Sequence, residues 1–371
     1  MGRAGGPLQQ IFLRFAPEYT AKFGDQIPRP HRRALFDIAA CRTEAMGGHK
    51  EICCDCEANR FVPHSCRHTL CASCHDAAID DWLAARANEL LPSTYFHVTF
   101  PLPKELREVA RSHQSIVLAA MMRAAAEALQ TLAEDRLGGR LGIMVVLHTW
   151  GRTLIWHPHV HCLIPGFIVC PDGEFKKISN NYLLPLKPLS KVYRAVFLRI
   201  VRSHRDAPRL PTIQWSKQWV ANCRACTEGP ANVLKYLARY TKRGPLPEKN
   251  ILSINDKQIK FRYISHRTKC SEECKLHPQE FLRRYLQHTP QPGFHRIRYY
   301  GFLAPGARRT LRAMKVALIW ALITLAPVIA ELRERGEKRA EPKCPHCGAT
   351  CFIRIDFIYP NRRGPPWQQT V

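Results

Sequence analysis

Acidic side chains are scarce in this sequence, which carries 30 Asp and Glu against 56 Lys and Arg over 371 residues. The formal net charge is therefore +26 at pH 7. A charge of this size is evidence about partners rather than about fold. It disfavours a hydrolase of small molecules and favours nucleic acid, because cations that neutralise phosphates release condensed counterions. An anionic membrane is the second candidate partner.

An export signal and a long apolar run are also missing. The first residues, MGRAGGPLQQIFLRF, contain no signal-like apolar segment. The most apolar stretch, Val316–Ala330, is shorter than a typical membrane span and contains Pro327. We therefore expect no membrane partner and a cytoplasmic, nucleoid-associated location. We also expect reduced thiols among the 16 cysteines, which favours metal binding.

Hydrophobic periodicity and turn residues predict an α+β chain without internal repeats. Helices are expected at 9–24, 31–46, 78–91, 102–136, 187–203, 231–243 and 280–288, strands at 95–100, 142–148 and 157–168, and a hairpin at 251–265. The composition changes abruptly after Gly47, where a cysteine-rich segment with few core-forming residues begins.

Two CxxC motifs lie in this segment, Cys53/Cys56 and Cys71/Cys74, with 14 residues between them. Two such knuckles supply the four thiolates of a tetrahedral Zn²⁺ site. Four thiolates leave no open position, so the site is expected to be structural. Scattered buried thiols are the alternative, and Cys66 is the first candidate to replace one of the four.

The remaining cysteines leave a second zinc site open. They form the pairs Cys223/Cys226 and Cys270/Cys274 and the group Cys344/Cys347/Cys351. The CPHCG sequence at 344–348 is a typical knuckle, but a lone knuckle lacks its other half.

His159 and His161 are two residues apart on a predicted strand, so their rings share one face while Val160 points to the other. Two such imidazoles can bind a divalent cation together with a third ligand. His148 and His157 are candidates for that ligand. The pattern also arises by chance, in which case the histidines are structural.

Tyr236 and Tyr240 lie one turn apart on a predicted helix. The cations beside them, which we expect to bind DNA, are Lys235, Arg239, Lys242 and Arg243. A phenol with a pKa of about 10 is a poor nucleophile at neutral pH. A metal that polarises a phosphate would correct this. Core-facing positions on an amphipathic helix are the alternative.

Together these features resemble the two-tyrosine HUH transposases of rolling-circle insertion sequences (IS91-like), which carry an N-terminal transposase zinc-binding domain. HUH denotes His-hydrophobic-His, here His159-Val160-His161. The matching stretches, in the family's order, are SCRHTLCASC (65–74), FHVTFPLP (96–103), LHTWG (147–151), HPHVHCLIPG (157–166), GPANVLKYLARYTKR (229–243) and EFLRRYLQHTPQPGFHRIRYYGFL (280–303).

The resemblance implies a fold. The HUH core would be a central antiparallel sheet flanked by helices, similar to a ferredoxin or RRM fold. An N-terminal helical and zinc-ribbon-like module would precede it. We expect a zinc-binding domain at 1–90, a catalytic domain with the tyrosine helix at 91–245, and a basic region for DNA contact or structural support at 246–371.

The resemblance also implies an activity. His159 and His161 would bind Mg²⁺ or Mn²⁺, and Tyr236 and Tyr240 would be the nucleophiles. One tyrosine, which we expect to be Tyr236, would attack single-stranded DNA at the end of a mobile element. It would keep the 5′ phosphate and leave a free 3′ OH, and the second tyrosine would accept another strand. The covalent intermediate stores the bond energy, so strands can be rejoined without ATP. The cysteine module would help recognise element ends.

Two other functions remain open. One is a noncatalytic zinc-dependent DNA-binding protein, which would tolerate loss of both tyrosines. The other is an HUH replication initiator or relaxase, although these usually lack the cysteine module. The basic, aromatic-rich segment 283–312 suits a single-strand groove, or else a strand with a solvated basic face. The residues do not specify the target sequence or the oligomeric state.

Overall fold

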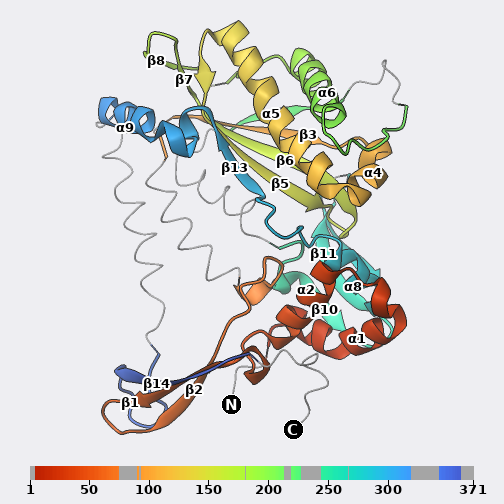
Figure 1. Ribbon diagram of the computed structural model, residues 1–371, viewed down its shortest axis with the longest axis vertical. Helices are drawn as coiled ribbons and strands as arrows, with labels where there is room; N and C mark the ends of the chain where they lie inside the picture. Colours follow the sequence, from red (N-terminus) through yellow and green to blue (C-terminus); the bar gives the residue numbers. More distant parts are fainter. Residues whose placement is uncertain are drawn as a thin grey trace.

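The computed structural model describes residues 5–74, 90–91, 93–179, 181–212, 219–226, 244–265, 267–318 and 342–360 (Figure 1). Over these ranges the chain is a mixed α+β protein with four antiparallel sheets.

A five-stranded sheet forms the centre of the upper half of Figure 1, with the strand order β13-β5-β6-β3-β9. Every neighbouring pair is antiparallel. The strands are β3 (Tyr95–Pro101), β5 (Ile143–Trp150), β6 (Trp156–Pro165), β9 (Asn222–Cys226) and β13 (Ile297–Tyr300).

Two long helices, α5 (Gln114–Leu137) and α6 (Leu186–Arg202), cover one face of this sheet. Val160, Cys162 and Ile164 of β6 are fully buried in the core beneath them. Because side chains alternate along a strand, His159 and His161 lie on the opposite face. Helix α5 is long and apolar enough to cross a membrane, but most of its apolar stretch is buried inside the protein.

A second core lies in the lower right of Figure 1 and joins segments from both ends of the sequence. Its elements are α1 (Pro7–Phe23), α2 (Arg29–Ala40), α8 (Pro278–Leu286) and the sheet β10-β11-β12 (Ile251–Ile254, Ile259–Ile264 and Ser271–Leu276). Phe12, Phe281 and Tyr285 are fully buried there. The Tyr285 ring stacks on Phe281 with centroids 5.8 Å apart.

A third sheet lies at the lower left of Figure 1, with the order β14-β1-β2. It pairs β1 (Gly48–Cys53) with β2 (Asn59–Pro63) and with β14 (Phe352–Ile358), which comes from the far end of the chain. Segments of the first and third expected domains therefore share a core and a sheet. The three expected boundaries themselves stay a prediction.

The remaining described elements are short. They are the sheet β4-β7-β8 (Arg140–Leu141, Phe167–Val169 and Phe175–Lys177), the helices α4 (Arg107–Ser112) and α9 (Arg308–Ala317), and six 3-10 turns.

Most expected elements are present at nearly the expected positions, because strong periodicity and Gly or Pro boundaries mark them. The expected strand 157–168 is broken at Gly166, whose N–H donates to the Thr94 carbonyl at 2.8 Å. The sequence analysis missed β1, β2, β4, β8, β9, β12, β14 and α9, and it gave a strand only as an alternative for the segment that contains β13. The expected helices at 78–91 and 231–243 lie almost entirely outside the described residues.

The Tyr285 hydroxyl donates a buried hydrogen bond to the Leu70 carbonyl at 2.8 Å. We expect Tyr285→Phe to lower the free energy of unfolding by about 1–3 kcal/mol, because it leaves a buried acceptor without its donor. Chemical denaturation followed by circular dichroism measures the change. Tyr182→Phe is the control, since Tyr182 is exposed and should change stability by less than about 0.5 kcal/mol. Equal stability of the two variants would contradict the assigned role.

Candidate metal centres

Three histidines meet on the face of the central sheet that lies opposite α5 and α6. His148 of β5 is the register partner of His159 on β6, and His161 follows two residues later. Each offers one ring nitrogen, and these atoms all lie within 4.8 Å of one another. The structure thus brings the two expected ligands together and adds His148, one of the two candidates for the third position.

His157 lies outside this cluster. Its Nδ1 is 2.5 Å from the Arg107 guanidinium, and its carbonyl is 2.8 Å from Nδ1 of His159. A carbonyl only accepts, so Nδ1 of His159 carries the proton. Nε2 of His159 is therefore the atom suited to bind a metal.

Burial keeps the imidazoles of His159 and His161 neutral at neutral pH. Desolvation lowers the pKa of His159 to about 4, although the hydrogen bond with the His157 carbonyl acts in the opposite direction. The pKa of His161 is held well below 6.5, mainly by burial and then by His148, His159 and His97. Neutral imidazole is the form that binds metals, so the cluster is preset for a cation.

His97 is a contributor that the sequence analysis missed. It lies on β3, and its Nε2 is 2.8 Å from Nδ1 of His161, with the two rings stacked 4.9 Å apart. Thr99 Oγ1 lies 3.4 Å from both nitrogens. This contact occupies Nδ1 of His161 and makes Nε2 its ligand atom. Alternation along FHVTF puts His97 and Thr99 on one face, but only the β3–β6 register shows which face that is.

The donor set constrains the metal. Among the described residues, the cluster contains three imidazoles and no carboxylate. Mg²⁺ demands near-ideal octahedral geometry from oxygen ligands, whereas Mn²⁺ also prefers oxygen but, as a first-row transition metal, accepts imidazole nitrogen more readily. Of the two expected ions, Mn²⁺ therefore fits these residues better.

The structure divides the four expected zinc ligands between two clusters. Cys71 and Cys74 meet Cys41 and Cys66, with Cys41 Sγ 3.5 Å and Cys66 Sγ 3.6 Å from Cys74 Sγ. Cys66, the expected replacement ligand, is therefore in this cluster. The prediction that all four CxxC cysteines bind one zinc ion is therefore wrong. Cys41, which directly follows α2, joins Cys66 and the Cys71/Cys74 knuckle instead.

Cys53 and Cys56 instead meet Cys344 and Cys347 of the CPHCG sequence, with all four sulfur atoms within 4.8 Å of one another. The antiparallel pairing of β1 with β14 brings these knuckles together. Within the described part of the chain, no other cysteines form a third such group; the remaining ones include Cys223, Cys226, Cys270 and Cys274. Cys54 and Cys351 form a disulfide, which differs from the expectation that all thiols are reduced.

The tyrosine motif lies outside the described residues. This applies to Tyr236 and Tyr240 and to the neighbouring cations Lys235, Arg239, Lys242 and Arg243. Their expected roles stay predictions.

The basic segment 283–312 has a partly structural role. Tyr285 is buried in the second core, and Arg284 pairs with Glu280 at 2.6 Å. Arg298 lies 5.5 Å from the centre of the Phe294 ring. Tyr285 therefore cannot stack on bases, whereas the Arg298–Phe294 pair is more accessible.

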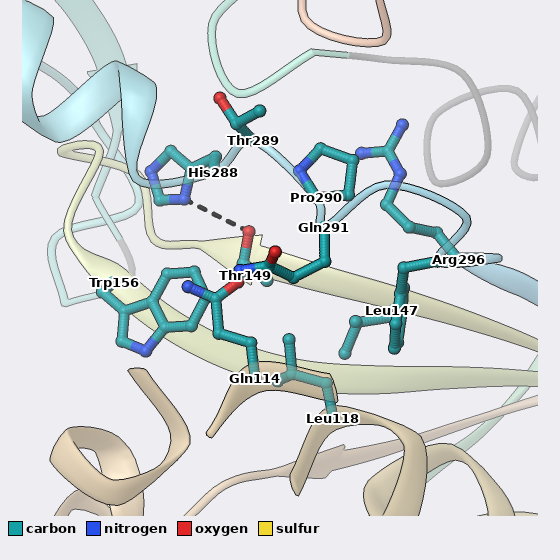
Figure 2. Close-up of a pocket in the computed structure, with 11 residues that line it drawn as sticks. Gln114, Leu118, Leu147, Thr149, Trp156, His288, Thr289, Pro290, Gln291 and Arg296 are labelled. Atoms are coloured by element: carbon teal, nitrogen blue, oxygen red, sulfur yellow. Dashed lines mark hydrogen bonds between the residues drawn. The ribbon is translucent and has the colours of Figure 1, made fainter. Parts of the chain in front are cut away.

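A pocket borders the β5–β6 hairpin on the covered side of the sheet (Figure 2). Leu147, which lines it, belongs to the core beneath α5 and alternates with His148. His288 encloses the pocket, with Nδ1 3.2 Å from Thr149 Oγ1 and Nε2 3.1 Å from the Leu154 carbonyl. The pocket is therefore separate from the histidine cluster.

Sequence models of two protein families match the chain. The model described as "Putative transposase" (Y2_Tnp) matches residues 142–310, and the one described as "Transposase zinc-binding domain" (Zn_Tnp_IS91) matches residues 11–102. The first range holds the histidine triad, and the second holds Cys41, Cys66, Cys71 and Cys74 as well as Cys53 and Cys56 of the other cluster. The two matches, together with the histidine cluster, define a transposase with a zinc-binding domain and a candidate histidine metal site.

Two curated relatives are also described as transposases. "Putative transposase y4qJ" of Sinorhizobium fredii (strain NBRC 101917 / NGR234) is 34% identical over 396 residues, covering 99% of this chain and 98% of the relative. "Transposase for insertion sequence element IS801" of Pseudomonas savastanoi pv. phaseolicola is 30% identical over 284 residues, covering 72% of this chain and 68% of the relative. No solved structure matches. The chain belongs to the IS91 family of transposases.

The position of His97 predicts an effect on metal affinity. We expect His97→Ala to weaken Mn²⁺ binding about 10–100-fold, because His161 loses the partner that orients its ring. Electron paramagnetic resonance of free Mn²⁺ measures the affinity. His204→Ala, at an exposed histidine, is the matched control. Unchanged affinity in His97→Ala would refute this role.

The lowered pKa values predict a weak pH dependence of metal binding. Protons compete with the metal at His159 only as the pH approaches about 4. We therefore expect Mn²⁺ affinity to stay nearly constant from pH 8 to 6. If a ligand imidazole had a pKa of about 6.5, the Mn²⁺ affinity would fall about fourfold by pH 6. A decline that begins near pH 6.5 would contradict burial as the cause.

The same buried histidines also affect the free energy of unfolding. The pH series of Mn²⁺ affinities therefore needs a control that the protein stays folded. His97 and His159 have pKa values of about 4 when folded and bind protons nearer 6.5 when unfolded. Between these values the unfolded state binds more protons, and stability falls as the pH falls. Circular dichroism at each pH identifies the range in which the chain remains folded.

Proposed function

We propose that this transposase cleaves and joins single-stranded DNA by tyrosine transesterification during rolling-circle-type transposition. The observation that carries the proposal is the triad of His148, His159 and His161, three imidazoles on adjacent strands with ligand atoms within 4.8 Å. In the same chain, Tyr236 and Tyr240 supply two phenols at helical spacing among cations.

The histidines would bind Mg²⁺ or Mn²⁺, with Mn²⁺ favoured by the imidazole donors. A bound cation would supply Lewis acidity that polarises the scissile phosphate. The register pairing of His148 with His159 and the contact between His97 and His161 hold the rings in place. A preset cluster of this kind avoids the cost of organising ligands when DNA binds.

The chemical step exchanges one phosphodiester for another. The tyrosine oxygen forms a bond to phosphorus, its proton passes to a base or solvent, and the bond to the 3′ oxygen breaks. The 3′ OH leaves protonated, and the 5′ phosphate stays on the tyrosine. Attack by a 3′ OH reverses the step and joins strands without ATP. Tyr236 is proposed as the initiating nucleophile, with Tyr240 available for a second strand.

Chain length permits these tyrosines to reach the histidines. The last described residue before them, Cys226, ends β9, which pairs with β3 beside the strand of the HUH motif. Tyr236 follows ten residues later, and ten extended residues span at most about 35 Å.

The N-terminal zinc-binding domain is proposed to hold a structural Zn²⁺ at Cys41, Cys66, Cys71 and Cys74 and to help recognise element ends. Four thiolates form a closed tetrahedral set, so this ion would have no catalytic role. The partner would be single-stranded DNA at the ends of the element, attracted by the net charge of +26. The proposed location is the cytoplasm, in contact with the nucleoid.

An assay for a covalent adduct tests the proposal. The protein is mixed with labelled single-stranded oligonucleotides that carry candidate end sequences, plus Mn²⁺ or Mg²⁺, and run on a denaturing gel. We expect a metal-dependent adduct that His161→Ala reduces at least about 100-fold. The double variant Tyr236→Phe/Tyr240→Phe should abolish it, and the single variants assign the initiating residue.

The outcomes separate the alternatives. No adduct on any strand, with salt-sensitive DNA binding intact, would favour a noncatalytic DNA-binding protein. An adduct formed on a replication or transfer origin in preference to element ends would favour an HUH initiator or relaxase.

A further inference from the structure

Four thiols gather at one end of the β14-β1-β2 sheet. Cys53 Sγ lies 3.5 Å from Cys347 Sγ, and Cys56 Sγ lies 3.6 Å from Cys344 Sγ. All four sulfur atoms lie within 4.8 Å of one another. A Zn²⁺ ion with Zn–S bonds of about 2.3 Å needs sulfur atoms about 3.8 Å apart. The spacing therefore fits one tetrahedral ion.

The two knuckles share one backbone conformation. The N–H of Glu57 donates to the Cys53 carbonyl at 3.0 Å, and the N–H of Gly348 donates to the Cys344 carbonyl at 2.9 Å. Both donors have left-handed backbones, with φ of 57° at Glu57 and 78° at Gly348. Two segments almost 290 residues apart thus present their cysteines in the same way.

A second backbone hydrogen bond also repeats in the two knuckles. The N–H of Cys53 donates to the Ala58 carbonyl at 3.0 Å, and the N–H of Cys344 donates to the Ala349 carbonyl at 2.7 Å.

The sheet that carries these thiols has little apolar packing to hold it. Ile353, Ile355 and Phe357 of β14 are 59%, 51% and 47% exposed. None of the three described hydrophobic cores contains a residue of β14. Small sheets without a core usually need a covalent or metal crosslink. The Cys54–Cys351 disulfide joins the same two segments.

We propose that Cys53, Cys56, Cys344 and Cys347 form a second structural zinc site, which ties the segment 342–360 to the β1–β2 hairpin. Neither family match reaches Cys344 or Cys347, since the matches end at residues 102 and 310. Binding displaces the thiol protons to solvent and involves no redox change. The inference is independent of the tyrosine chemistry.

Metal analysis of the full chain tests the site. The protein is purified with a non-thiol reductant, and zinc per chain is measured by mass spectrometry. Cys344→Ser/Cys347→Ser should bind one zinc fewer than the wild type. Cys270→Ser, at an exposed cysteine outside both clusters, should bind as much as the wild type. Unchanged zinc in the double variant would overturn the proposal.

A spectroscopic measurement excludes a contribution from the histidine cluster. Co²⁺ bound to thiolates gives a sulfur-to-metal charge-transfer band, and the double variant should lose about half of its intensity, since two similar four-thiolate sites become one. If that variant does not fold, ¹¹³Cd NMR of the wild type counts the four-thiolate sites instead. Two four-thiolate resonances support the second site, and one resonance overturns it.

Discussion

The antiparallel register between β5 and β6 is the constraint on which the candidate catalytic centre depends. It sets His148 opposite His159 and Val146 opposite His161, so three rings converge on one face. The alternate residues of the same strands, such as Val160, fill the core beneath α5 and α6. A shift of one residue would place the imidazoles in the core and the apolar side chains outside. The hydrophobic core thus selects the arrangement that creates the site.

The turn of this hairpin is held by the second core. Leu154, with a left-handed φ of 61°, is fully buried among residues of α1, α2 and α8. Its carbonyl accepts hydrogen bonds from Gln287 at 2.9 Å and from the ring of His288. The same core receives Leu70, whose carbonyl is bonded by Tyr285 beside the first cysteine cluster. The zinc-binding domain and the histidine hairpin are therefore connected through α8.

The cysteine clusters show a different kind of constraint. Each joins segments that local spacing does not relate, Cys41 with the 66–74 segment in one case and the 53–56 turn with the 344–347 turn in the other. A tetrahedral ion accepts any four thiolates that reach it. Spacing alone therefore identifies knuckles but not their partners, and backbone pairing between β1 and β14 decides the second set.

The sequence by itself determined the types of the strongly periodic elements, the HUH strand with its two histidines on one face, and the presence of cysteine knuckles. These properties depend on period, turn residues and short spacing, which are local. Only the tertiary structure decided that His148 is the third member of the histidine cluster, that His97 contacts His161, and how the thiols divide between two clusters. Each of these needs the register or contact of segments far apart in the chain, and register is set by the packing of the whole core rather than by neighbouring residues.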